Sequence, residues 1–414
     1  MRTVGLITEY NPFHNGHLHH LRESRRLANA EVAVAVMSGH FLQRGEPALV
    51  DKWVRTRMAL AAGVDVVVEL PFPWACNSAP VFAEGAVRCL EALGGIDALC
   101  FGSESGALDG LQKAAGLLLD REESIDSATR RLLREGMSYP AARAQVVAEL
   151  ADPKLAELLA SPNNILGVEY LKALARSGSA IRPLTLPRIG AGYHEQRAVG
   201  RIASATGIRA MLGRGEDVAD YLPPACAPIL AEALQAGLGV DEGLLHRLLS
   251  ATILRDAERL AEIYQVEAGL QNRLVEAAQI ATGLEELIVA VKSRQLTRTR
   301  IQRVLTHVLL GTRRELVEEA LATGPLYLHL LGCSRRGQAW LARTRKRRSL
   351  PLVQNFSRIH AALRRRYGTD ERLHAAALRQ LALEERATRH YALLLKKRPP
   401  GDLRRDYRQD AILA

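Results

Sequence analysis

Short apolar runs rich in β-branched residues alternate with helical stretches over the first hundred residues, and this alternation is what most constrains the fold. A strand–helix–strand order predicts a parallel sheet with helices on both faces. The valines at 66–68 form a run without polar residues, as a strand buried on both faces requires. The expected strands cover residues 3–9, 31–37, 64–70, 97–101 and 181–186, and the expected helices cover 17–29, 52–62, 80–93 and 205–212.

The pattern changes further along the chain. Residues 106–180 look mainly helical, and Pro223 with Pro224 marks a plausible domain boundary. Beyond it come Leu- and Ala-rich helical stretches with almost no strand signal. We therefore expect an α/β, Rossmann-like parallel-sheet domain over residues 1–220 and a mostly α-helical domain over residues 221–414.

Composition limits the class of protein. A hydrophobic content of 48% with mean hydropathy near zero is typical of a globular chain and excludes disulfide scaffolds, collagen-like repeats and wholly disordered chains. The net charge of +11 favours a polyanionic partner (nucleic acid or anionic membrane) or phosphate-rich ligands, although basic proteins with neither exist. The five cysteines show no C-x-x-C spacing and are expected to be reduced thiols.

Targeting signals are not visible in the sequence. Residues 3–9 read as a strand and not as the start of a signal peptide, and the most apolar stretch, 64–76, is interrupted by Asp65 and Glu69. We expect a cytoplasmic protein with no membrane partner. The tail at 396–408 carries Pro-Pro-Gly and mixed charges, so we expect it to fray.

The most informative local signal lies at residues 5–17. An expected strand ends there, a turn rich in Asn, Pro and Gly follows, and a helix starts near Gly16. A helix N-terminus favours phosphate. His14 and His17 are three residues apart, so both imidazoles can face one ligand and donate to the charge that develops on an attacked α-phosphate. Two alternatives stay open. One is a metal site at His14, His17 and His20, for which no suitably spaced acid or cysteine is seen, and the other is an ordinary turn and helix cap.

Longer strings carry a family resemblance. The H-x-G-H element after the first strand is similar to the nucleotidyltransferase superfamily that includes the class I aminoacyl-tRNA synthetases. Over residues 3 to about 310 the chain closely resembles the bacterial tRNA(Met) cytidine acetate ligase family. The strings that carry this resemblance are TEYNPFHNGH (8–17), MSGHFLQRGEP (37–47), FGSE (101–104), PNNILG (162–167) and SATGIR (204–209).

The resemblance implies a nucleotidyltransferase domain over residues 1–220, a tRNA-binding helical domain over 221–414 and a two-step reaction. Acetate and ATP, with Mg²⁺, would give acetyl-adenylate and pyrophosphate, and the acetyl group would then pass to the wobble cytidine of elongator tRNA(Met). The implied catalytic residues are His14, His17 and Arg209. The implied nucleotide-binding residues are Ile7, Thr8, Glu9, Tyr10, Asn11, Pro12, Phe13, His14, Asn15, Gly16, His17, Leu18, His19, His20, Gly102, Asn163, Arg188, Ser204 and Thr206.

Several of these positions also admit simpler interpretations. Gly102 follows the fourth expected strand, where open α/β sheets bind ligands, but it could equally be a turn glycine. Asn163 is taken as the nucleotide contact although Asn164 is equally suited, and the pair could simply cap a helix. Arg188 alone would be read as a surface charge. The string at 204–209 alone would be read as a capped helix, and it lacks hydroxyls at two positions where related motifs carry them.

Polar and basic segments suggest further contacts with anions. Residues 38–52 form an expected long loop in which backbone amides, Arg44 and Lys52 could draw acetate, pyrophosphate or a tRNA phosphate; the alternative is a solvated loop. Residues 292–303 and 334–349 are rich in Lys and Arg and contain no acidic residue. Such clusters favour binding to tRNA phosphates, and the alternative is a solvated helix face.

Rival functions remain at this point. One is a small-molecule adenylyltransferase or carboxylate-activating ligase of the same fold, against which the basic helical half argues. The other is a non-catalytic RNA-binding protein, against which the paired histidines and Arg209 argue. No residue stands out in the sequence as a general base for acetyl transfer.

Overall fold

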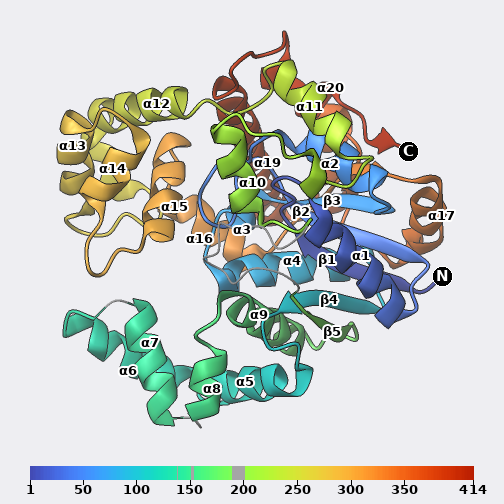
Figure 1. Cartoon of the computed structure of the whole chain (residues 1–414), viewed down its shortest axis with the longest axis horizontal. Helices are drawn as coiled ribbons and strands as arrows, with labels where there is room; N and C mark the ends of the chain where they lie inside the picture. Colours follow the sequence, from blue (N-terminus) through green and yellow to red (C-terminus); the bar gives the residue numbers. More distant parts are fainter. Residues whose placement is uncertain (138, 151–152, 189–200) are drawn as a thin grey trace.

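The computed structural model describes residues 1–137, 139–150, 153–188 and 201–414. Within these residues, eight strands form one sheet in the order β5-β4-β1-β2-β3-β6-β7, with β8 beside β6 (Figure 1). Strands β1 to β5 are mutually parallel, as expected, whereas β6 runs antiparallel to β3. The strands are β1 (Thr3–Thr8), β2 (Val32–Ser38), β3 (Val66–Leu70), β4 (Ala98–Ser103), β5 (Arg182–Pro187), β6 (Leu328–Cys333), β7 (Leu352–Val353) and β8 (Ile412–Leu413).

The order of the strands reverses at β1. The chain proceeds from β1 to β2 and β3 on one side and then returns to place β4 on the other side of β1. The loops leaving the carboxyl ends of β1 and β4 therefore diverge, which opens a crevice between them. This edge of the sheet is where a ligand is expected to bind.

Helices cover both faces of the sheet, as the sequence predicts. Val66 and Val68 pack into one core cluster and Val67 into the other, and all of them are fully buried. One face packs against α4 and α9, and the other against α1 and α2. These helices are α1 (Asn15–Ala28), α2 (Lys52–Ala61), α4 (Ala79–Leu93) and α9 (Pro162–Ser177).

Helical lobes extend from the sheet on the same side of the molecule (Figure 1). One lobe is inserted between β4 and α9, and the other follows α11 and has its own apolar core. The first lobe contains α5 (Leu108–Asp120), α6 (Glu122–Arg134), α7 (Tyr139–Leu150) and α8 (Pro153–Leu158). The second contains α12 (Glu242–Arg255), α13 (Leu270–Ile280), α14 (Leu284–Val291) and α15 (Arg298–Leu309). The remaining helices are α3 (Phe72–Ala75), α10 (Ala205–Gly213), α11 (Ala227–Gln235), α16 (Arg314–Thr323), α17 (Arg335–Thr344), α18 (Ile359–Tyr367), α19 (Glu371–Leu393) and α20 (Arg405–Arg408).

The second half of the chain is mostly helical, as expected, but it also supplies β6, β7 and β8, which the sequence did not indicate. A short apolar run such as β6 cannot be distinguished from a buried helical segment by periodicity alone. The expectation that the tail frays is wrong. β8 pairs with β6, and Asp406 is 2% exposed because it reaches a buried lysine.

The buried lysine is Lys52, and its position shows that the expected contact between Lys52 and an anionic ligand is wrong. Lys52 does not face a ligand from the loop. Its Nζ is fully buried and lies 2.7 Å from Glu69 Oε1, 2.7 Å from Asp406 Oδ1 and 3.8 Å from Glu384 Oε1. His329 completes the group, which we call the Lys52 cluster, with Nδ1 2.6 Å from Glu69 Oε2. Burial alone would lower the pKa of Lys52, but the carboxylates outweigh it and raise that pKa.

Among the described residues, no helix combines the length and apolar character that crossing a lipid bilayer would require.

Candidate active site

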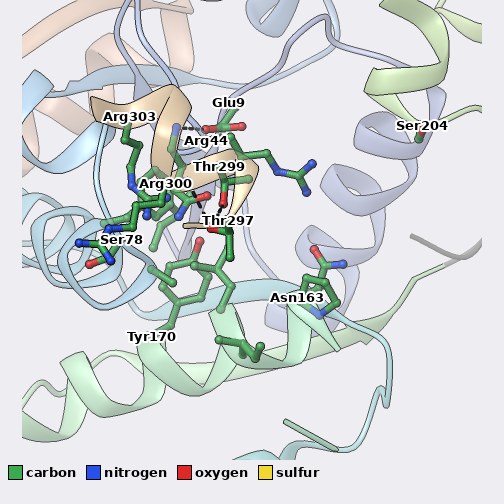
Figure 2. A pocket seen from close by; sticks show the side chains of 18 of the residues that line it. Glu9, Arg44, Ser78, Asn163, Tyr170, Ser204, Thr297, Thr299, Arg300 and Arg303 are labelled. Carbon is green, nitrogen blue, oxygen red and sulfur yellow. Dashed lines mark hydrogen bonds between the residues drawn. The ribbon is translucent and has the colours of Figure 1, made fainter. Parts of the chain in front are cut away.

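A cavity of about 1280 Å³ opens at the carboxyl edge of the sheet. One wall, which we call the α1 wall, comes from the ends of β1 and β4, the start of α1 and the start of α9; its polar residues include Thr8, His14, His17 and Asn163. The facing wall, the α15 wall, comes from the second helical lobe and includes Thr297, Thr299, Arg300 and Arg303 (Figure 2). The cavity therefore joins the sheet edge to a lobe more than a hundred residues later in the chain.

His14 and His17 hold each other at the first turn of α1. The Gly16 N–H donates to His14 Nδ1 at 3.0 Å, and the His14 N–H donates to His17 Nδ1 at 3.3 Å. The imidazole rings stack with their centroids 3.7 Å apart. Because each Nδ1 accepts a hydrogen bond, the proton of each neutral ring resides on Nε2. Each ring can therefore offer an Nε2–H donor.

The surroundings of both histidines favour the neutral form of the ring before a ligand binds. Burial, together with the nearby Arg188 and Arg209 charges, lowers the pKa of His14 to about 3. Burial, His14 and Arg188 lower the pKa of His17 well below its ordinary value. A polyphosphate would favour the charged rings and oppose these shifts.

Gly16 is required by the packing of this turn. A Cβ at Gly16 would lie 2.8 Å from His14 Cε1, so a side chain there would displace the imidazole. Tyr10 and Phe13 are buried behind the turn, and both pack against the His17 ring with centroids 5.0 and 5.5 Å away. They fix the imidazole from behind and do not line the cavity.

The start of α9 separates the roles of its two asparagines. Asn164 is 3% exposed, and its Oδ1 accepts hydrogen bonds from the N–H groups of Glu104 and Ser105 at 2.9 and 3.2 Å. Asn163 lines the cavity, where Arg188 Nη1 donates to its Oδ1 at 3.2 Å. Asn163, whose Nδ2 donates to Glu104 Oε1 at 2.6 Å, is thus the one of the pair that lines the cavity, whereas Asn164 holds the loop after β4.

The 204–209 string forms the start of α10. Ser204 lines the cavity and caps the helix, with its Oγ accepting from the Gly207 N–H at 3.1 Å. Arg209 is held by other groups: it donates to the Asn11 carbonyl oxygen at 2.9 Å and to Glu46 Oε1 at 2.8 Å. Neither Arg209 nor Thr206 is among the cavity-lining residues.

The α15 wall contains residues that sequence reasoning assigned elsewhere or missed. Arg300 and Arg303 belong to the basic stretch expected at tRNA, yet they line this cavity. Arg300 pairs with Glu267, and Arg298 pairs with Glu285, so this stretch draws its acidic partners from other segments.

The α15 wall packs directly against the loop after β2. A Cβ on Gly45 would lie 2.1 Å from Arg303 N, and Thr306 Oγ1 donates to the Gly45 carbonyl oxygen at 2.8 Å.

The expected site residues divide into those that line the cavity and those that support it. The cavity is lined by Ile7, Thr8, Glu9, His14, Gly16, His17, His19, His20, Gly102, Asn163, Arg188 and Ser204. The expected residues that do not line it are Tyr10, Asn11, Pro12, Phe13, Asn15, Leu18, Thr206 and Arg209. Lining residues that the sequence did not suggest include Ser78, Phe82, Arg134, Tyr170, Gln265, Thr297 and Thr299. Ser78, Tyr170 and Gln265 stand in no recognisable motif, so only the folded chain reveals them.

No group of three or more His, Cys, Asp or Glu side chains in the described part of the chain could hold a metal ion. The walls instead present imidazole, amide, hydroxyl and guanidinium donors. Such a set matches the phosphates of a nucleotide.

Comparisons with known proteins agree with this chemistry. The family model described as HIGH Nucleotidyl Transferase matches residues 1–406. A tRNA(Met) cytidine acetate ligase from Syntrophotalea carbinolica is 58% identical over 95% of this chain and 94% of its own. The enzyme of the same name from Alkaliphilus metalliredigens is 39% identical over 96% and 95% of the two chains.

Solved structures resemble the whole chain. The crystal structure of Thermotoga maritima TmcAL bound with alpha-thio ATP is 33% identical, covers 100% of this chain and 99% of its own, and has a TM-score of 0.90. The apo structure of the same protein, with the same identity and coverage, has a TM-score of 0.92.

Proposed function

The chain belongs to the HIGH nucleotidyl transferase family and, within it, to the tRNA(Met) cytidine acetate ligases, and from this premise we propose how its cavity performs the reaction. ATP and acetate give acetyl-adenylate and pyrophosphate, and the acetyl group passes to the wobble cytidine of elongator tRNA(Met) to form N4-acetylcytidine. Activation is needed because a free carboxylate is a poor acyl donor. A tRNA substrate also supports a cytoplasmic location.

The observation that carries the proposal is the histidine pair at the mouth of the β1–α1 turn. His14 and His17 stand at the N-terminus of α1, line the cavity and each have an Nε2–H donor, which supports placing the attacked α-phosphate there. Their donors stabilise the negative charge that accumulates on the phosphate during attack. Gly102, Asn163 and Arg188 support the nucleoside end from the neighbouring strand ends.

The β- and γ-phosphates are assigned to the start of α10. Ser204 already faces the cavity, and Thr206 and Arg209 belong to the same helix start. In this proposal Arg209 neutralises the departing pyrophosphate after it exchanges Glu46 for phosphate, because an arginine forms a bidentate pair with either anion.

Mg²⁺ is expected to accompany ATP. With no cluster of three or more potential ligands in the described residues, the wall chemistry fits an ion held by phosphate oxygens and water and not a resident metal. When bound, the ion would neutralise phosphate charge.

A single assay tests the function against its rivals. Purified protein is mixed with ATP, labelled acetate and total tRNA. Label in tRNA that depends on ATP is the expected result. Acetate-dependent ATP–pyrophosphate exchange without labelled tRNA would favour a small-molecule ligase of the same fold. A protein with neither activity would be a scaffold that binds RNA.

The second basic stretch supports the tRNA assignment and can be tested separately. Arg345, Lys346 and Arg347 are exposed on the turn after α17, whereas Arg348 is partly buried and donates to the Leu341 carbonyl oxygen. Replacing the exposed residues by Gln should weaken tRNA binding. The slope of the logarithm of the binding constant against the logarithm of the salt concentration should also become shallower, by about one for each phosphate contact that is lost. Filter binding at several salt concentrations measures this.

The control for that experiment is Arg255→Gln. Arg255 is exposed but pairs with Asp256 at 2.7 Å, so its charge is already balanced, and the salt slope should stay as in the unmodified protein. An unchanged slope in the triple variant would remove this turn from the tRNA interface.

A further inference from the structure

Glu9 is a carboxylate placed between the two walls of the cavity. It follows the last residue of β1, five residues before His14, and lines the cavity. Figure 2 shows its side chain above Thr297 and Thr299 of the α15 wall, with Asn163 and Ser204 to the right of these residues in the view. The phosphate contacts proposed above do not include this carboxylate.

Hydrogen bonding holds Glu9 in place while leaving part of it accessible. The Gln43 N–H donates to Glu9 Oε1 at 2.7 Å. Glu9 lines the cavity and is only partly buried, so a donor that enters the cavity can reach its carboxylate.

The space beside Glu9 suits a nucleotide of an RNA loop. Thr297, Thr299, Arg300 and Arg303 give this end of the cavity hydroxyl and guanidinium groups, which bind phosphate and sugar oxygens. At about 1280 Å³ the cavity exceeds the usual range of a single small-molecule pocket, roughly 300–1,000 Å³, and so leaves room for a base beside ATP. A cytidine that leaves its stack could enter this cavity, which both Glu9 and the α15 residues line.

We propose that Glu9 is the general base of acetyl transfer, accepting the N4 proton of the cytidine held against the α15 wall. The inference rests on the proposed function and adds a residue for its second step. The N4 nitrogen attacks the carbonyl carbon of acetyl-adenylate and forms an N–C bond. The bond between that carbon and the phosphate oxygen breaks, and AMP leaves with the electron pair. The N4 proton moves to Glu9 and then to solvent. The products are N4-acetylcytidine, AMP and one proton.

The surroundings of Glu9 raise the pKa of its carboxyl above the ordinary value and so make it a stronger base. Burial, as the largest cause, raises the pKa of Glu9, and the Glu46 carboxylate raises it further. The Gln43 hydrogen bond and the charges of Arg44 and Arg209 oppose that rise. Arg55 and Tyr170 also face this carboxylate from α2 and α9. A base is most effective when its pKa lies near the working pH.

The test separates the two steps of the reaction. Glu9→Gln keeps an oxygen that can accept from the Gln43 N–H but cannot take a proton. ATP–pyrophosphate exchange with acetate should fall far less than transfer does, although Glu9 also lines the nucleotide cavity. Single-turnover transfer from enzyme-bound acetyl-adenylate to saturating tRNA should fall by about 10²–10⁴-fold. The transfer rate of the unmodified enzyme should rise with pH through the Glu9 pKa, and that rise should be absent in Glu9→Gln.

Two further variants sharpen the result. Glu9→Asp retains a carboxylate and should recover part of the transfer rate together with its rise with pH. Glu84→Gln makes the same chemical change on the surface of α4, where Glu84 pairs with Arg88 at 2.6 Å, and should leave both steps unchanged.

Distinct outcomes would overturn the inference. Equal loss of exchange and transfer would place Glu9 in acetate activation, and an altered Mg²⁺ dependence of exchange would make it a metal ligand. A loss of transfer that saturating tRNA restores would make it a binding residue. Undiminished transfer by Glu9→Gln would exclude it altogether. If the unmodified protein does not label tRNA at all, the proposed function fails and this inference fails with it.

Discussion

The His17→Ala variant should lose acetate-dependent ATP–pyrophosphate exchange, with the rate falling by about 10²–10³-fold. His17 offers its Nε2–H to the cavity because its Nδ1 accepts the His14 N–H at 3.3 Å. Removing the ring deletes a donor that acts on the charge formed as acetate attacks the α-phosphate. It also frees the stacked His14 ring, whose centroid lies 3.7 Å from that of His17.

The measurement needs a control for folding and for binding. His17→Ala should still bind tRNA, and its thermal midpoint should show that the fold persists. His360→Ala removes an exposed histidine of α18 and should exchange pyrophosphate at the unmodified rate. Retained exchange in His17→Ala would refute the assigned role.

The Lys52→Met variant should lose about 3–5 kcal/mol of unfolding free energy, because it removes the cation of a buried ion cluster. Glu69, Glu384 and Asp406 are each at most 2% exposed, and each has a carboxylate oxygen within 4 Å of Lys52 Nζ, so the substitution removes a buried charge that all of them contact. Burial and the Glu69 charge already raise the pKa of Glu384 well above its ordinary value. Chemical denaturation at neutral pH measures the change.

Arg57→Met is the matched control, since Arg57 lies on the same helix. Arg57 is 45% exposed and pairs with Glu232 at 2.9 Å on the surface. A surface pair of this kind contributes about 0–1 kcal/mol, so the loss should be small. Equal unfolding free energies for Lys52→Met and Arg57→Met would show that the Lys52 cluster does not stabilise the fold.

The first half of the fold was predictable because its signals are local. The valines at 66–68 alternate between two buried faces, and a parallel sheet covered by helices is the arrangement that buries both. The strand–turn–helix string around His14 and Gly16 indicates a phosphate site for the same reason, since the helix N-terminus lies within the string itself.

The rest depends on contacts between distant residues. The sequence around Lys52 reads as a loop that could bind anions, but Asp406 and Glu384 come from more than three hundred residues away to bury it. Arg300 stands in an acid-free stretch, and its partner Glu267 lies in another segment. Charge counted along the chain cannot reveal such pairs, because pairing is decided in space.

The antiparallel pairing of β6 with β3 has a consequence for how the molecule is made. β3 is complete once residue 70 has been synthesised, yet its open edge is not covered until residues 328–333 arrive, and β8 adds to β6 only after residue 413. A nascent chain or a fragment ending near residue 220 would carry an uncovered strand of valines, the kind of edge that recruits other chains. The edge of β3 is therefore protected only after residues 328–333 have been synthesised.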